Sequence, residues 1–163
     1  LRNTLGKGLS DDRIFAAVEN LASAGIMGMR LYFMIGLPGE DDGDILAIPE
    51  FAKRIREAMT KFRPKAPSAG SVEVTISPFI PKPGTKMASA KFAGIAEIKK
   101  RVKILRSAAG KIPWLKLGFD SPDGAACEAF LAKAGPEAIE FLETAFETGS
   151  PKAALKKHAP WLL

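Results

Sequence analysis

Hydrophobic positions recur along the chain with two spacings, one typical of helices and one typical of strands. After Ser10, apolar residues return every three or four positions up to Ala22, and Gly25 ends the run. A serine before an acidic first turn and a glycine after the last periodic residue are ordinary helix boundaries, so the pattern predicts a helix. Residues 29–35 are apolar at nearly every position, which favours a strand buried on both faces.

The same order of elements returns twice more. Apolar residues at helical spacing predict a second helix up to Met59, with Asp42 or Asp44 as its N-terminal cap. Residues 71–79 alternate between β-branched and polar side chains, as a strand does. A basic helix is expected over residues 92–109.

A short third strand is predicted over residues 114–119, and the chain is then expected to form short helices. Asp120 or Ser121 with the following proline opens the first of these helices. The later breaks combine a glycine that stops one helix with a proline that starts the next, at residues 135–136 and 149–151.

This order of elements predicts the fold class. Strands separated by helices of about twelve or more residues pair in parallel through right-handed crossovers. Three such units are too few for a closed eight-stranded barrel, but they suit the second half of a larger one. We therefore expect an α/β fold. Residues 1–119 would be parallel βα units forming half of a TIM-like partial barrel, and residues 120–163 a helical C-terminal segment.

Charge is unevenly distributed along the chain. The formal net charge is +6, and residues 51–116 hold 16 Lys or Arg against 3 Glu. A basic region of this kind can face an anionic partner such as RNA, a nucleotide or a phosphorylated substrate. It suits a set of solvated helix faces better, because few aromatic residues interleave with the charges along the sequence.

Side chains suited to catalysis or metal binding are scarce. Cys127 is the only cysteine and His158 the only histidine, so this chain has neither an internal disulfide nor a standard zinc or iron–sulfur ligand set of its own. We expect Cys127 to be a packed side chain on a helix and His158 to be a surface residue. The glutamates between residues 137 and 147 predict a solvated acidic face.

The beginning of the chain and its apolar runs bear on its surroundings. The sequence opens LRNTLGKG, with neither an initiator Met nor a signal pattern. No apolar run approaches the roughly 20 residues of a membrane helix. We therefore expect a piece cut from a longer protein that is cytoplasmic.

Two loops of unusual composition follow predicted strands. Residues 36–40 read GLPGE, and residues 77–85 read SPFIPKPGT. Ligands of parallel α/β folds bind beyond the carboxyl ends of the strands, where both loops are expected. The glycines allow close approach of the backbone, and the proline-rich loop leaves carbonyl groups that can bind the edge of a base. Each loop alone also suits an ordinary turn, and the acids from Glu40 to Asp44 are expected to be helix-start residues.

Together these loops carry a family resemblance. LYFMIGLPGEDDGD and, about 40 residues later, SPFIPKPGT resemble the fifth and sixth strands of the partial barrel of radical S-adenosylmethionine enzymes. LRNTLGKGLSDDRIFAAVENLASAG resembles the segment after the fourth strand, so the likeness covers roughly residues 1–90. The remainder, including WLKLGFDSPDGAACEAFLAKAG, looks like the C-terminal extension of the members that carry a cobalamin-binding domain.

The resemblance implies a full-length iron–sulfur oxidoreductase that cleaves S-adenosylmethionine to a 5′-deoxyadenosyl radical, which then abstracts hydrogen from a small-molecule substrate. It also implies a 4Fe-4S cluster held by a CxxxCxxC motif, and this chain contains no such motif. The chain is therefore expected to be inactive alone and to need the upstream half of its own barrel. Cobalamin is a further cofactor that the resemblance allows.

Four residues of the first two segments match positions with a role in the family. Lys7 falls where many relatives place a basic residue that pairs with the cofactor carboxylate, although it also suits a surface lysine. Met34 matches an apolar residue that packs on the adenine, and Gly36 would give that ring room. Tyr32 stands where some relatives use an acidic ribose ligand, so the ribose contact is left open.

Three more residues match the stretch that meets the adenine edge after the sixth strand. These are Ser77, Pro78 and Phe79, and the resemblance implies that their backbone makes the contact.

Two other functions remain open at this point. One is methylthiolation or methylation of RNA within the same superfamily, which the basic middle region would suit. The other is a non-enzymatic, basic α/β domain that binds nucleic acid or another partner. A CxxxCxxC segment encoded upstream would favour the enzymes over the binding domain.

Overall fold

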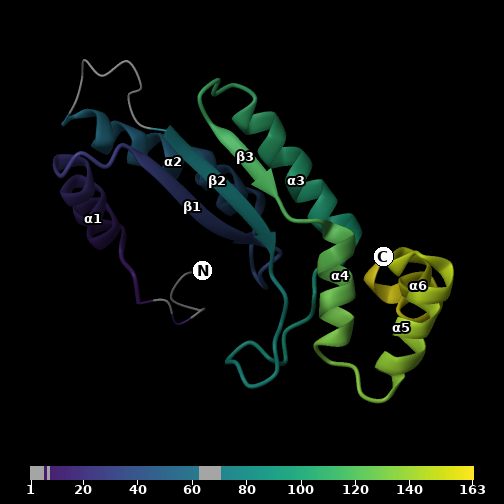
Figure 1. The fold of residues 1–163 in the computed structure, drawn as a ribbon. Coiled ribbons are helices and arrows are strands. Elements are labelled where there is room, and N and C mark those ends of the chain that lie inside the picture. Colours follow the sequence, from purple (N-terminus) through teal and green to yellow (C-terminus); the bar gives the residue numbers. More distant parts are fainter. Residues whose placement is uncertain (1–5, 7, 63–70) are drawn as a thin grey trace. The chain divides into compact units, whose positions relative to one another are not determined.

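The computed structural model describes residues 6, 8–62 and 71–163, in which helices and strands alternate before a helical end (Figure 1). The elements are α1 (Asp11–Ser23), β1 (Gly28–Ile35), α2 (Asp42–Thr60), β2 (Ser71–Pro78), α3 (Ile95–Ala109), β3 (Lys116–Phe119), α4 (Pro122–Leu131), α5 (Glu137–Thr148), α6 (Pro151–His158) and the short 3-10 helix η1 (Pro160–Leu162).

The three strands form one parallel sheet in the order β1-β2-β3. Strand β2 pairs with β3 so that Glu73 lies opposite Lys116 and Ile76 lies opposite Phe119. Helix α2 connects β1 to β2 and helix α3 connects β2 to β3, which is the kind of connection that parallel pairing needs. The predicted α/β class and parallel pairing are confirmed.

Contacts divide the described chain into two compact units. The first comprises the described parts of residues 1–33, 41–76 and 103–119, and the second comprises residues 34–40, 77–102 and 120–163. The division predicted at residue 119 is by position in the sequence. The contacts instead group the carboxyl ends of β1 and β2, with the loops that follow them, together with the C-terminal helices.

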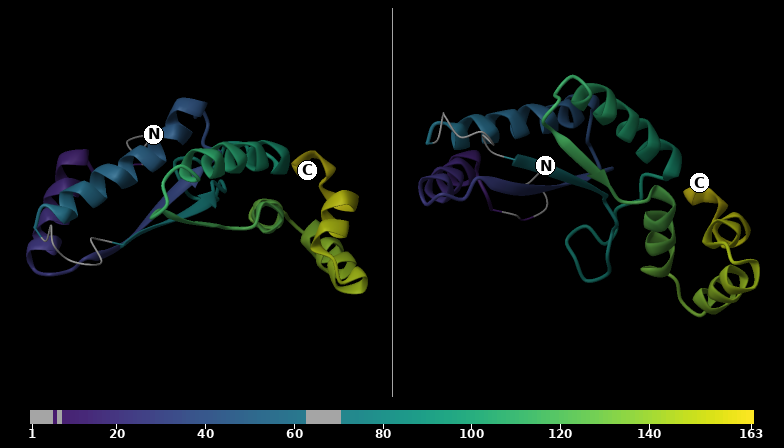
Figure 2. Two further views of the ribbon diagram at one scale, coloured as in Figure 1. Left: turned by 90° about the horizontal axis from the view of Figure 1, so that it is seen from above. Right: turned by 45° about the horizontal axis from the view of Figure 1, so that its top comes forward.

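In the first unit, helix α2 packs on one face of the strands and helix α1 packs against α2. Figure 2 (left) shows α2 running along one side of β1 and β2. The ring of Phe51 lies 5.5 Å from that of Phe15 on α1 and 6.1 Å from that of Phe33 on β1, measured between centroids. Apolar positions of α2 at helical spacing are buried: Ile45, Ile48, Ala52, Ile55 and Met59.

The opposite face of the strands is exposed, so the prediction that β1 is buried on both sides is wrong. Exposure alternates along β1, and the Tyr32 side chain is 71% exposed. Strand β2 alternates as well, with Val72, Val74 and Ile76 buried and the residues between them more exposed. One face of the sheet therefore packs on helices and the other is open in the described part of the chain. The apolar run at 31–35 could not reveal this, because Tyr32 tolerates exposure on account of its hydroxyl group.

Helix starts follow the predicted capping chemistry, with one shift. The Ser10 hydroxyl caps α1 by accepting from the Arg13 N–H at 3.3 Å. Helix α2 is capped by Asp41, not by Asp42 or Asp44. The Asp41 carboxylate accepts from the Asp44 N–H at 2.9 Å, and the Asp44 carboxylate accepts from the Asp41 N–H at 3.2 Å. This reciprocal pair is a capping box, which holds both free N–H groups.

Two predicted boundaries differ by a few residues. Helix α3 begins at Ile95 and not at residue 92, because Gly94 has a φ of +85°, which a helix cannot continue. Strand β3 begins at Lys116 because residues 112–115 form a turn, in which the Leu115 N–H donates to the Ile112 carbonyl at 3.0 Å. Within the described ranges, no helix combines the length and the apolar composition needed to cross a membrane.

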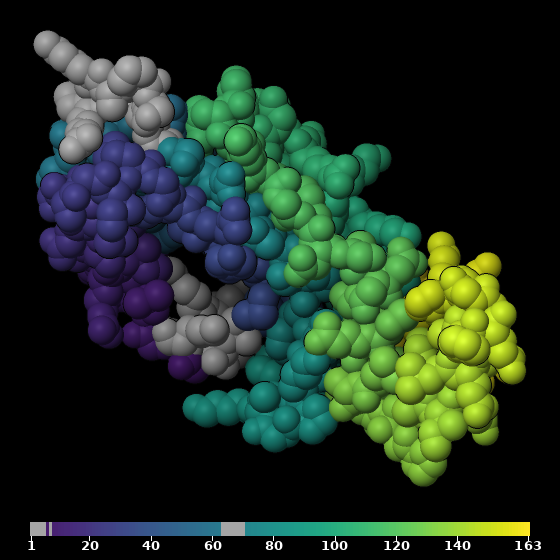
Figure 3. Space-filling model, viewed as in Figure 1, coloured from purple at the N-terminus to yellow at the C-terminus, as the bar shows by residue number. Residues whose placement is uncertain are grey.

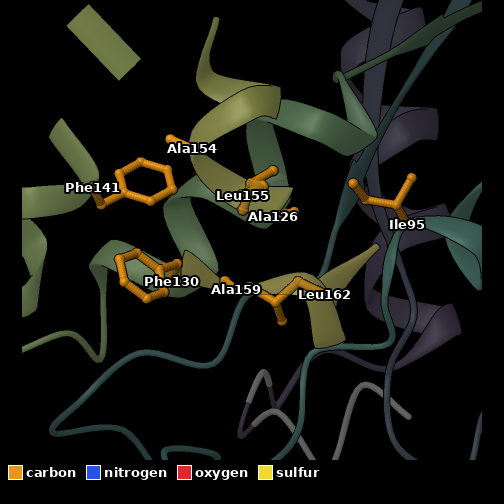
Figure 4. Packing of buried hydrophobic residues seen from close by; sticks show 8 residues of the cluster. All are labelled: Ile95, Ala126, Phe130, Phe141, Ala154, Leu155, Ala159 and Leu162. Atoms are coloured by element: carbon orange, nitrogen blue, oxygen red, sulfur yellow. The ribbon is translucent and has the colours of Figure 1, made fainter. Parts of the chain in front are cut away.

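The second unit has an apolar core formed mainly by its C-terminal helices. The rings of Phe130 and Phe141 lie 4.7 Å apart, on the side of the cluster away from Ile95 (Figure 4). The C-terminus is held to the start of α3 by the Ala96 N–H, which donates to the Leu163 carbonyl at 3.2 Å. The buried cluster comprises Ile95, Ala126, Phe130, Phe141, Ala154, Leu155, Ala159 and Leu162.

Candidate functional site at the carboxyl ends of the strands

The GLPGE loop after β1 is shaped by two glycines with positive φ. Gly36 has a φ of +87° and Gly39 has a φ of +79°, a region that side chains other than glycine rarely adopt. Gly36 is also tightly packed: an added Cβ would lie 2.6 Å from Ile98 Cδ1 and 3.3 Å from Ala93 Cβ. This residue must therefore be glycine both for its backbone conformation and for its contact with α3.

Glu40 closes this loop. Its side chain is 2% exposed, and its Oε2 accepts from the Gly36 N–H at 2.6 Å and from Nη1 of Arg101. Arg101 is 12% exposed and also donates from Nε to Glu97 Oε1 at 3.0 Å. The prediction that Glu40 is a helix-start residue is therefore wrong. A buried carboxylate needs compensating hydrogen bonds, and here the loop backbone and an arginine supply them.

The loop after β2 adjoins the loop after β1. The Phe79 N–H donates to the Ile35 carbonyl at 2.8 Å, so the GLPGE and SPFIPKPGT segments leave neighbouring strands at the same edge. Phe79 is buried. Its N–H is used by the sheet, and the edge of a base would have to meet carbonyl groups of this stretch.

A pocket of about 510 Å³ opens beside the carboxyl ends of β2 and β3. The Ser77 hydroxyl donates to Asp120 Oδ2 at 2.6 Å at its rim. Figure 3 shows the loop after β2, in teal, against helix α4, in green. Lys82 on that loop forms an ion pair with Glu128 on α4. The pocket is lined by Ser77, Pro78, Ile80, Asp120, Ser121, Gly124, Ala125 and Glu128.

The lining of this pocket combines apolar side chains with two carboxylates, one of which, Glu128, pairs with Lys82. Pro78, Ile80 and Ala125 offer flat apolar surface, and Asp120 and Glu128 contribute carboxylates. Such a lining suits a ligand with a planar apolar part and either hydroxyl groups or a positive charge. It does not suit a phosphate, which the carboxylates would repel.

The predicted site residues fall in three different situations. Lys7 lies outside the described residues. Ser77 and Pro78 line the pocket, whereas Phe79 is buried behind the sheet edge. Met34 is half-buried near the end of β1, and Gly36 is buried against Ile98. Contact of any of them with an adenine ring stays a prediction.

The open face of the sheet, in the first unit, carries charged and polar side chains. Arg30 on β1 donates from Nη2 to Glu73 on β2 at 2.7 Å. The hydrogen bond from Arg30, and then its charge, lower the pKa of Glu73 below its ordinary value, and Lys116 on β3 adds to this. Tyr32 lies on the same face. A row of alternating charges thus crosses all three strands.

The two isolated candidates for chemistry have packing roles. His158 is half-buried, its Nε2 lies 2.9 Å from the Thr144 hydroxyl, and its ring packs edge-on to Phe141, so the expectation of a surface residue is wrong. Cys127 packs against the apolar core, and burial raises the pKa of its thiol. Among the described residues, no three His, Cys, Asp or Glu side chains gather as metal ligands would.

Sequence reasoning missed Asp120 and Arg101. The sequence indicates Asp120 only as a helix-start residue, because its partner Ser77 is 43 positions away and no local pattern connects the two. Arg101 was part of a basic helix, and its partner Glu40 is 61 residues away. The signal available was the fold itself: in parallel βα units, residues directly after successive strands meet at one edge.

Comparison with known proteins supplies one relative. No protein-family model matches the chain, and no solved structure matches it. An uncharacterised protein of Methanocaldococcus jannaschii is 26% identical over 157 residues, which cover 96% of this chain and 32% of that protein. The chain therefore spans about a third of the length of this relative, whose name states no activity.

Proposed function

We propose that this chain forms part of the adenine side of the S-adenosylmethionine site in a radical S-adenosylmethionine iron–sulfur oxidoreductase. The observation that carries the proposal is the hydrogen bond of 2.8 Å from the Phe79 N–H to the Ile35 carbonyl. It joins the two segments on which the family resemblance rests. Because β1 and β2 are neighbouring parallel strands, their ends lie at one sheet edge, where ligands of such folds bind, so both segments could contact one ligand.

The open face of the sheet favours a partial barrel rather than a doubly wound sheet as the fold of the full-length protein. A parallel sheet covered by helices on both sides is apolar on both sides. Here the face opposite the helices carries the Arg30–Glu73 pair and exposes Tyr32. Charged side chains of this kind suit the lumen of a barrel that receives a polar substrate. The upstream half of that barrel and a cytoplasmic location are parts of the same proposal.

The pocket beside β2 fits a nucleoside in size and chemistry. Its volume of about 510 Å³ lies in the range of small-ligand sites, roughly 300–1,000 Å³. Pro78 and Ile80 would contact the flat ring. We propose that Asp120 binds the ribose hydroxyls, the contact that Tyr32 leaves open, because a carboxylate accepts two hydrogen bonds from a vicinal diol. Ser77 orients Asp120 through its hydroxyl group.

The GLPGE loop limits how the ring could approach. The side of Gly36 on which a Cβ would project is filled by Ile98, so only the other side of its backbone could receive an adenine ring. Met34, two residues earlier, would supply apolar contact. When bound, S-adenosylmethionine and its cluster supply a one-electron cleavage to a 5′-deoxyadenosyl radical. The share of this chain is to bind and orient the nucleoside and to exclude water.

The test uses the full-length protein that contains this chain, reconstituted anaerobically with iron and sulfide. We expect the absorbance of a 4Fe-4S cluster and, after reduction, formation of 5′-deoxyadenosine from S-adenosylmethionine. A protein with neither would contradict the proposal and favour a non-enzymatic binding domain.

A variant pair assigns the ribose contact. Asp120→Asn should raise the KM for S-adenosylmethionine at least about tenfold and leave the cluster absorbance unchanged, since a lost hydrogen bond to a charged group costs about 1.5–3 kcal/mol. Asp123→Asn, two helical positions from Ser121, serves as the control and should leave the KM unchanged. Equal KM values for the parent and Asp120→Asn would exclude this role for Asp120.

A further inference from the structure

A second pocket lies in the first unit, and none of its residues belongs to the two loops of the proposed cofactor site. It has a volume of about 280 Å³ and is formed by the second half of α2 and the turn between α3 and β3. Three of its side chains are cationic, Lys53, Arg56 and Lys111, against one carboxylate, Glu57. Lys53 also pairs with Glu50 at 2.7 Å, which neutralises part of its charge.

An arginine–tryptophan stack forms one wall of this pocket. The Arg56 guanidinium lies over the Trp114 ring, 4.5 Å from its centroid. Trp114 is half-buried, which limits the motion of its ring. This guanidinium and indole place a cation and an aromatic ring together at the pocket wall, beside which a further flat ring can stack. The sequence hid this pairing because the two residues are 58 positions apart, which also corrects the view that aromatic residues do not accompany the basic ones.

The basic character continues beyond the pocket on the same elements. Residues 51–62 and 103–116, all in the first unit, contain eight Lys or Arg (four in each range) against the single acid Glu57. The Arg106 guanidinium lies over Phe119, 5.0 Å from its centroid, as a second cation–aromatic pair. Not all of these cations serve the pocket, since Arg54 pairs with Asp11, Lys61 pairs with Glu19 and Lys116 lies opposite Glu73. The three that line it, Lys53, Arg56 and Lys111, suit successive phosphates better than a single anion.

We infer that this pocket binds one nucleotide of a single-stranded nucleic acid, with the base stacked beside the Arg56–Trp114 pair and the phosphates held by Lys53 and Lys111. The volume of about 280 Å³ lies just below the range of small-ligand sites, roughly 300–1,000 Å³, so the pocket suits one nucleotide unit and no larger ligand. The inference does not depend on the proposed cofactor site, because that site lies in the other unit. Binding to RNA would not test the cleavage of S-adenosylmethionine, and cleavage of S-adenosylmethionine would not test the binding of RNA.

The experiment uses Trp114 as its own reporter. The chain has two tryptophans, and Trp161, 72% exposed, can be replaced by phenylalanine so that Trp114 alone emits. In the Trp161→Phe protein we expect a single-stranded oligouridylate of about ten nucleotides to quench this fluorescence in a saturable manner, because stacking brings a base against the reporter. Absence of quenching together with absence of binding by anisotropy would overturn the inference.

Four variants distinguish the contribution of charge to the affinity from the contribution of stacking. Arg56→Gln should weaken binding about fivefold or more, through loss of both stacking and charge. Arg56→Lys keeps the charge and should keep the salt dependence while losing affinity. Lys111→Gln should lower the slope of log affinity against log salt by about 0.7. Lys100→Gln, an exposed lysine on α3 in the other unit, is the matched control for charge and should change the affinity less than about twofold.

A comparison of ligands distinguishes a site for nucleic acid from a site for a free nucleotide. Uridine monophosphate should bind at least about tenfold more weakly than the oligomer, because it lacks the flanking phosphates. Equal affinity for both would assign a free-nucleotide site and overturn the inference. Binding that Arg56→Gln and Lys111→Gln leave unchanged would overturn it as well, with circular dichroism verifying that both variants fold.

Discussion

At the scale of single residues, Glu40 explains much of the GLPGE loop. The carboxylate folds back four positions to accept from the Gly36 N–H and also meets Arg101 on α3. Gly36 then needs a positive φ and room for Ile98. A loop held from inside in this way keeps its shape without a ligand, which is the property a preformed cofactor wall requires.

Glu40→Gln is expected to destabilise the protein by about 3 kcal/mol, because it leaves the Arg101 charge poorly compensated at a mostly buried position. Urea unfolding measures the loss. Glu50→Gln removes the partner of Lys53 at an exposed position and should cost less than about 0.5 kcal/mol. Equal losses for the two variants would show that burial of the Glu40 pair has no energetic weight.

The Arg30–Glu73 pair predicts a pH effect. Arg30 holds the pKa of Glu73 below its ordinary value. Stability from the pair is therefore present above the ordinary pKa of a glutamate and is lost as the pH falls through the lowered pKa of the folded protein. Arg30→Gln should raise the pKa of Glu73 toward the ordinary value, as measured by NMR titration of its side-chain carboxyl. An unchanged pKa would mean that the pair does not form in solution.

At the scale of elements, the apolar face of α5 anchors the second unit through a single aromatic side chain. Phe141 is buried against Phe130 and beside His158, while Phe146 on the same helix is 88% exposed. Two phenylalanines five positions apart thus differ almost completely in burial. Helical geometry explains this, since five residues turn a side chain well away from the first one.

Phe141→Ala should lower the free energy of unfolding by about 3–5 kcal/mol, because it leaves a cavity in the core. Phe146→Ala is the control and should change it by less than about 0.5 kcal/mol. Thermal and urea unfolding of both variants measure these changes in the free energy of unfolding. A large loss for Phe146→Ala would indicate that this exposed ring is covered in solution.

Elements were largely predictable from the sequence, and the contacts between them were not. Ser10 and the Pro122 region marked helix starts correctly because capping is local chemistry. The exposure of Tyr32 was missed, since a run of apolar residues does not say what covers each face. The Ser77–Asp120 and Arg56–Trp114 contacts join residues more than 40 positions apart, so only the tertiary fold reveals them.

At the scale of the whole molecule, the two units point to separate tasks. The second unit holds the two loops that carry the family resemblance and the pocket of Ser77 and Asp120. The first unit holds the open polar sheet face and the basic pocket of Arg56 and Trp114. The proposed cofactor wall and the proposed nucleic-acid contact therefore belong to different units and can be tested separately.

The most direct test of the cofactor wall is photolabelling of the full-length, reconstituted protein with an azido-adenine analogue of S-adenosylmethionine, followed by peptide mapping. We predict labels in residues 34–37 and 77–80, abolished by excess S-adenosylmethionine. Labels confined to other parts of the protein, with the cluster present and S-adenosylmethionine still competing, would contradict the placement of the adenine at the ends of β1 and β2.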